Sequence, residues 1–79
     1  MKVKVEIRLK SDILDPQGDA VKNALQRMNF KHILSLRQGK LIELNLDTTD
    51  RKLAHKIAEK MAKDLLANPI METFNIIIE

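Results

Sequence analysis

The feature that most constrains the fold is a strict alternation of charged and apolar residues at the start of the chain. From Lys2 to Lys10, every second residue is apolar and each residue between them is charged. Successive side chains of a β-strand point to opposite faces of the sheet, so this period of two predicts a half-buried strand. One face of the strand is expected to lie against the core and the other toward solvent.

A helix is predicted after this strand, from about Pro16 to Asn29. Apolar residues recur there at spacings of three and four, which places them along one face of a helix. Asp15 is a candidate N-cap, Pro16 has the φ angle that suits the first helical position, and Asn29 is a plausible helix end. The apolar face consists of Ala20, Val21, Ala24, Leu25 and Met28.

A β-hairpin is predicted next. Leu34 and Leu36 alternate with polar neighbours before a Gln38-Gly39 turn, and Ile42, Leu44 and Leu46 alternate after it. This turn is a weaker hairpin signal than Asn-Gly.

A second amphipathic helix is predicted from about Asp50 to Ala67, followed by a last strand. The helix can be capped by Asp47, Thr48 or Thr49, and its apolar residues follow at a spacing of four. Asn68 can adopt the left-handed conformation that ends helices, and Pro69 cannot continue one. The apolar residues of the helix are Leu53, Ile57, Met61 and Leu65, those of the strand are Phe74, Ile76 and Ile78, and the methionines at 28, 61 and 71 are expected to fill the core.

The predicted order is strand, helix, strand, strand, helix, strand. This is the βαββαβ pattern of an α+β, ferredoxin-like single domain over residues 1–79, with an antiparallel sheet and both helices on one face. The other sheet face would carry Ile33, Leu41 and Ile77 among charged residues. Such mixed character suits a self-association face. Alternatively, these are scattered exposed residues without a role.

Length and composition favour an oligomer. A chain of 79 residues has a small core, and without cysteine it has no disulfides to support that core. No apolar run exceeds three residues and the N-terminus has no signal-peptide pattern, so we expect a cytoplasmic protein without a membrane partner. Interleaved charges that sum to +3 are only a weak argument for nucleic acid.

The search for chemistry finds no catalytic, cofactor or metal site. His32 and His55 lack metal-ligand spacing, and the sequence offers no nucleophile motif or phosphate loop. Asp12, Asp15 and Asp19 could bind magnesium, but carboxylates at a helix start are also favoured by the helix dipole. With only two aromatic residues, the sheet is not expected to stack RNA bases.

Gly18 is the residue of the Asp-Pro-Gln-Gly stretch that helix capping does not explain. Glycine within a first helical turn costs about 1 kcal/mol relative to alanine. We therefore expect a close backbone approach at Gly18, either to a partner subunit or to the neighbouring chain.

Three motifs resemble the PurS family, the small subunit of phosphoribosylformylglycinamidine synthase. They are L-D-P-Q-G-x-A-V-x-x-A-L from Leu14 to Leu25, R-x-G-K-x-I-E-L from Arg37 to Leu44, and L-L-A-N-P-I-x-E from Leu65 to Glu72. The resemblance implies a non-catalytic subunit of a purine-synthesis complex that aminates formylglycinamide ribonucleotide with glutamine and ATP. It also implies a dimer or tetramer, with a glutaminase subunit and a large synthetase subunit that holds ATP and magnesium as partners.

Three exposed loops are the candidate partner surfaces of such a subunit. Each also has a local interpretation, as a helix start, a hairpin turn and a helix end. A rival function is an ACT-type regulatory domain that binds a small molecule. The candidate residues are Asp15, Pro16, Gln17, Gly18, Arg37, Gly39, Lys40, Asn68 and Pro69.

Overall fold

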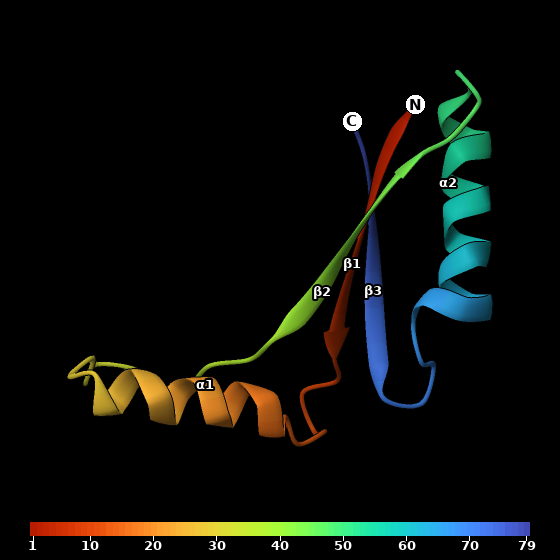
Figure 1. Cartoon of the computed structure of the whole chain (residues 1–79). Helices are drawn as coiled ribbons and strands as arrows, with labels where there is room; N and C mark the ends of the chain where they lie inside the picture. Colours follow the sequence, from red (N-terminus) through yellow and green to blue (C-terminus); the bar gives the residue numbers. More distant parts are fainter.

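The computed structural model describes all 79 residues and shows an α+β chain with a three-stranded antiparallel sheet and two helices (Figure 1). Its α+β class and antiparallel sheet are as predicted. The elements are β1 (Lys2–Leu9), α1 (Pro16–Arg27), β2 (Gly39–Asn45), α2 (Arg51–Met61), a π-helical turn η1 (Ala62–Leu66) and β3 (Glu72–Ile78).

The strand predicted from the opening alternation is the centre of the sheet. The strand order is β2-β1-β3, and Val5 lies opposite Ile42 on one side and Ile76 on the other. Val3, Val5 and Ile7 are at most 1% exposed. They face α2, and the charged residues of β1 lie on the opposite face, which no helix of this chain covers (Figure 1).

The helix α2 and the turn η1 pack against the sheet through small residues, whereas Leu53 and Leu65 are 46% and 84% exposed. Ala54, Ala58 and Ala62 are fully buried and recur every four residues, so the helix backbone lies close to β1. The prediction that methionines fill the core is wrong. Met28, Met61 and Met71 are 65%, 39% and 42% exposed.

The cap of α2 is Asp50, which lies one residue past the candidates named from the sequence. Its carboxylate accepts hydrogen bonds from the backbone N–H groups of Lys52 and Leu53 at 3.0 and 3.3 Å. The hydroxyl of Thr48 in turn accepts a bond from the N–H of Asp50.

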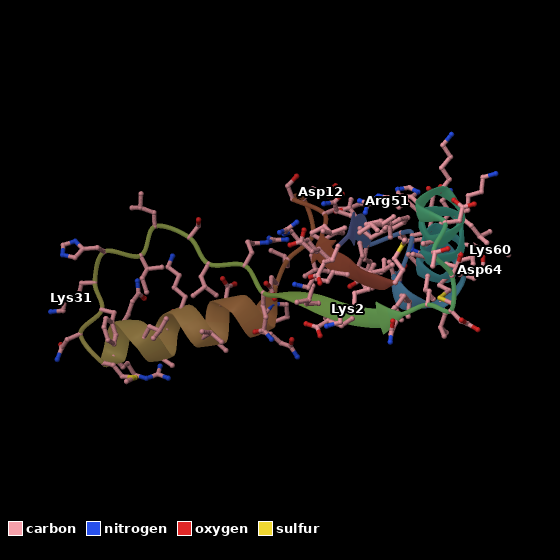
Figure 2. All side chains as sticks on the ribbon, turned by 90° about the horizontal axis from the view of Figure 1, so that it is seen from above. Lys2, Asp12, Lys31, Arg51, Lys60 and Asp64 are labelled. Carbon is pink, nitrogen blue, oxygen red and sulfur yellow. The ribbon has the colours of Figure 1, made fainter.

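The first half of the predicted hairpin is not a strand, and α1 does not share a sheet face with α2. Residues 31–38 have no strand pairing and run back beside α1. The helix and this return segment project from one end of the sheet (Figures 1 and 2). We call residues 16–38 the arm and the three strands with α2 and η1 the body.

The turn at the tip of the arm is fixed by Asn29, the helix end predicted from the sequence. Its φ is 75°, the left-handed conformation that asparagine tolerates. The N–H of Asn29 donates to the carbonyl of Gln26 and that of Phe30 to the carbonyl of Leu25, at 3.1 and 3.0 Å. This reversal starts the return segment, and Figure 2 places Lys31 at the distal tip.

Candidate functional site

The three candidate loops meet at one end of the sheet, although they lie far apart in sequence. The end of β1 leads into residues 15–18, residues 37–40 lead into β2, and residues 68–71 lead into β3. We call this region the loop end. A hollow of about 160 Å³ lies there, lined by residues of all three strands and of the first two loops.

Asp15 connects the first two loops. One oxygen of its carboxylate accepts the N–H of Gly18 at 2.9 Å and the other accepts the N–H of Gln38 at 2.7 Å. The side chain is both the predicted cap of α1 and a link to the residue before β2. These bonds, first of all that from Gln38, hold the pKa of Asp15 below its ordinary value, with the nearby Arg37 guanidinium contributing. Asp15 is only 6% exposed, so it is a structural link and not a contact residue.

Gly18 is buried at a close approach, but the approaching groups belong to its own chain and not, as predicted, to a partner subunit or the neighbouring chain. A Cβ there would lie 2.5 Å from an Asp15 carboxylate oxygen and 2.9 Å from the carbonyl oxygen of Leu36. An alanine would therefore push the return segment away from α1. Gly39 has a similar constraint, since its Cβ would lie 2.7 Å from the carbonyl oxygen of Ile7.

Cationic side chains connect the remaining loops. Arg37 donates to the carbonyl of Lys10 at 2.9 Å, and the ammonium of Lys10 donates to the carbonyl of Pro69 at 3.1 Å. Lys40 lies 3.4 Å from the carboxylate of Glu72. Lys10 and Glu72 were not among the candidates, although Glu72 closes the third motif. Arg37, Lys40 and Pro69 remain exposed and available to a partner.

Asn68 follows the second helical segment but does not adopt the left-handed conformation that was predicted for it. Its φ is not positive, because Asn29 is the only non-glycine residue with a positive φ. The Asn68 side chain accepts the N–H of Ile70 at 2.9 Å, and its N–H donates to the Glu72 carboxylate at 2.7 Å. The amide therefore closes a tight turn before β3.

The predicted self-association face is only partly assembled by one chain. Leu41 and Ile77 lie on the uncovered sheet face, opposite Glu6 and Lys4 of β1, and are 55% and 37% exposed. Ile33 lies on the arm and not on this face, because residues 31–38 are not a strand. On the same face Lys4 pairs with Glu79 at 2.6 Å, which raises the pKa of Lys4 and lowers that of Glu79.

No three histidine, aspartate or glutamate side chains lie close enough together to hold a metal ion. Asp15 is one of the three aspartates considered as a magnesium site. Both oxygens of its carboxylate are already engaged by backbone N–H groups. His55 lies 3.5 Å from Glu59 one helical turn away, on the exposed side of α2. None of the helices is long and apolar enough to span a membrane.

Comparison with known proteins places this geometry in a family. The family model PurS, described as phosphoribosylformylglycinamidine (FGAM) synthase, matches residues 2–79. The PurS subunit of Bacillus subtilis is 40% identical over 78 residues, covering 99% of this chain and 92% of the relative. The Mycobacterium leprae subunit is 42% identical, covering 91% of this chain and 87% of the relative.

Solved structures agree with these relatives. PurS of Methanocaldococcus jannaschii superposes with a TM-score of 0.89 at 29% identity, covering 99% of this chain and 94% of that one. A chain of the PurLQS structure from Thermotoga maritima matches with a TM-score of 0.87 at 26% identity, covering 96% and 93%. The chain therefore belongs to the PurS family of phosphoribosylformylglycinamidine synthase subunits.

Proposed function

We propose that this chain is the non-catalytic docking subunit of a phosphoribosylformylglycinamidine synthase, joining a glutaminase subunit to a large synthetase subunit. The observation that carries the proposal is the match to a chain of the solved PurLQS assembly over 96% of this chain. The M. jannaschii relative is named as a subunit of formylglycinamide ribonucleotide amidotransferase in the purine biosynthetic pathway. In our proposal the complex works in the cytoplasm as a glutamine-dependent ligase.

The proposal assigns the chemistry to the partners. ATP, magnesium and the ribonucleotide bind to the large subunit, glutamine is hydrolysed by the glutaminase subunit, and this chain holds no cofactor. It brings the two active centres into one assembly so that ammonia passes from one to the other. Shaped surfaces, and not reactive groups, are what such a role requires.

The loop end is the proposed partner surface. It gathers three separate loops into one rigid region, because Asp15, Arg37 and Lys10 link them through hydrogen bonds of 2.7 to 3.1 Å. The exposed residues of this region are Pro16, Gln17, Arg37, Gly39, Lys40, Asn68 and Pro69. A rigid surface costs little conformational entropy on binding.

Self-association is also part of the proposal, with a dimer as the basic unit and a tetramer as a further assembly of dimers. The Cα radius of gyration is 15.8 Å, against about 12 Å for a compact chain of this length. Nine of 79 residues are buried. A second copy would cover surface that one chain cannot bury by itself.

The test is reconstitution with purified glutaminase and synthetase subunits. We expect no glutaminase or ATPase activity from this chain alone, and strong dependence of the glutamine-driven rate on its addition. Ammonium salt in place of glutamine is the control, because free ammonia reaches the synthetase without docking. Full glutamine-dependent activity without this chain, or turnover by this chain alone, contradicts the proposal.

A matched pair of arginine variants tests whether the loop end is the surface that contacts a partner subunit. Arg37 at the loop end and Arg51 at the start of α2 each donate one hydrogen bond to a backbone carbonyl, at 2.9 and 3.3 Å. Arg37→Ala is expected to lower the glutamine-driven rate several-fold, whereas Arg51→Ala leaves it unchanged. Equal activity of both variants contradicts a partner contact at the loop end.

A further inference from the structure

Lys10 directly follows β1 and forms the hydrogen bonds that join the loops of the loop end. Its N–H donates to the carbonyl of Met71 at 2.8 Å, and its ammonium donates to the carbonyl of Pro69 at 3.1 Å. Its carbonyl accepts the N–H of Ile13 at 3.0 Å and the guanidinium of Arg37 at 2.9 Å. One residue at the end of the central strand therefore contacts the turn before the first loop, the second loop and the third loop.

The first two loops are joined without the side chain of Lys10. The Asp15 carboxylate accepts an N–H group from each of them. Arg37 donates to the backbone carbonyl of Lys10, which any residue at this position would provide. A change of the Lys10 side chain therefore leaves the first two loops fixed relative to each other.

The third loop, in contrast, depends on the Lys10 side chain. Asn68 and Ile70 form hydrogen bonds only within their own turn, with Glu72 as the further partner. The base of this loop is also held, by the bond from the Lys10 N–H and by an ion pair to β2. The bond from the Lys10 ammonium to the Pro69 carbonyl is the one that fixes the tip of the loop to the end of β1.

The Lys10 ammonium has no carboxylate partner within the chain. Lys10 takes part in none of the six ion pairs, so its charged group is directed to the Pro69 carbonyl. The ring of Pro69 fixes its own φ, and the Asn68 side chain closes the turn, so the tip has little internal freedom. The position of this tip relative to the sheet is therefore what the lysine decides.

We propose that Lys10 is a positioning residue of this subunit, whose ammonium holds the tip of the third loop in place beside the other two loops. The inference rests on the proposed function, in which the loop end is the surface that a partner subunit contacts. A loop that is already held in its bound position loses less conformational entropy when the partner binds. Lys10 therefore acts on the affinity for the partner and not on the rate of the complete complex.

Three variants test the role of the ammonium. Lys10→Met removes it and keeps an unbranched side chain, and Lys10→Arg replaces it with another charged donor. Lys63→Met is the matched control, because Lys63 also forms one hydrogen bond, to Glu59 at 2.9 Å, and lies outside the loop end. Each protein is titrated into purified glutaminase and synthetase subunits. The titration gives the concentration for half of the maximal glutamine-driven rate and the rate at saturation, and far-UV circular dichroism verifies folding.

We expect Lys10→Met to raise the half-maximal concentration about three- to tenfold and to leave the rate at saturation unchanged. Lys10→Arg and Lys63→Met are expected to behave as the wild type. An unchanged half-maximal concentration for Lys10→Met, or a lower rate at saturation, overturns the proposal. The proposal is also overturned if Lys10→Arg has the same defect as Lys10→Met.

Backbone relaxation measured by NMR separates this inference from the proposed function, because it needs only this chain. The order parameter of the Ile70 amide is expected to fall in Lys10→Met and to stay unchanged in Lys10→Arg and Lys63→Met. If the turn loosens in this way but the wild-type chain does not raise the glutamine-driven rate, the docking function fails and the positioning of the loop by Lys10 stands. If the wild-type chain supports that rate but the Ile70 amide stays equally rigid in Lys10→Met, the positioning role fails and the docking function stands.

Discussion

The body and the arm of this chain both contain many apolar residues but use them differently. Six of the seven buried hydrophobic residues belong to the body and the seventh, Ala67, directly follows η1, whereas Gly18 is the only buried residue of the arm. The arm has four basic residues and one acidic residue, whereas the rest of the chain has ten of each, so the whole net charge of +3 lies on the arm. The body therefore contains almost all of the core, whereas no apolar side chain of the arm is buried.

The largest expected effect is in the body. Ile7 is 1% exposed and packs in the core with Ala62 of η1 and Ala67, so Ile7→Ala removes three carbons and leaves a cavity. We expect the free energy of unfolding to fall by about 2 to 5 kcal/mol in urea titration. Met28→Ala on the arm is the comparison, with a small effect on the unfolding of the protomer. Equal losses at both positions would remove the distinction between body and arm.

Gly18→Ala tests the junction of the arm and the body. The added Cβ would overlap the Asp15 carboxylate and the Leu36 carbonyl, and overpacking of this kind costs about 1 to 3 kcal/mol. Urea titration gives the loss, and sedimentation velocity is expected to give a weaker dimer, because the return segment has to move. Asn23→Ala, at an exposed position of α1, is the matched control and is expected to be neutral or slightly stabilising. If Gly18→Ala has the stability and the dimerisation of the wild type, the Asp-Pro-Gln-Gly stretch acts only as a helix cap.

A smaller effect is expected at the cap of α2. Asp50→Ala removes the acceptor for two backbone N–H groups and is expected to lower the unfolding free energy by about 1 kcal/mol. Asp47→Ala is the control, because Asp47 lies in the same exposed stretch but is not the residue that caps the helix. Thermal unfolding of the two variants gives the comparison, and equal midpoints would contradict the cap assignment.

The smallest expected effect is on the pH dependence of stability, through Asp15 at the junction of the arm and the body. The pKa of Asp15 is lower in the folded chain than the ordinary value of 3.8, so its charged form is stabilised by folding. This contribution is complete above the unfolded pKa and is lost as pH falls through the lowered folded pKa. We expect Asp15→Asn to flatten the acid limb of the stability curve below about pH 4. A curve with the same acid slope as the wild type would contradict the role of the carboxylate.

Much of the body was predictable because its signals are local. The alternation in β1, the last strand and the helix after Asp50 each follow a period that the residues themselves display. The prediction of the buried face of α2 and η1 was wrong, because Ala54, Ala58 and Ala62 share the spacing of four residues with the larger apolar residues beside them. In this helix the close approach of the backbone to β1 favours the small side chains.

The arm could not be predicted because long-range bonds decide its position. Leu34 and Leu36 alternate as a strand would, but the Asp15 link to Gln38 and the bond from Lys22 to the carbonyl of Leu34 hold the segment beside α1. The three loops of the candidate site were recognised singly from their residue types. Their convergence at one end of the sheet follows from strand order, and no local pattern encodes it.

The most direct test of the division into body and arm is amide hydrogen exchange as a function of protein concentration. We predict that protection of β1 is the same at all concentrations, because its hydrogen bonds belong to one chain. Protection within residues 16–38 is predicted to rise as the proposed dimer forms. Protection of the arm that does not change between the monomeric and dimeric concentration ranges would contradict the account.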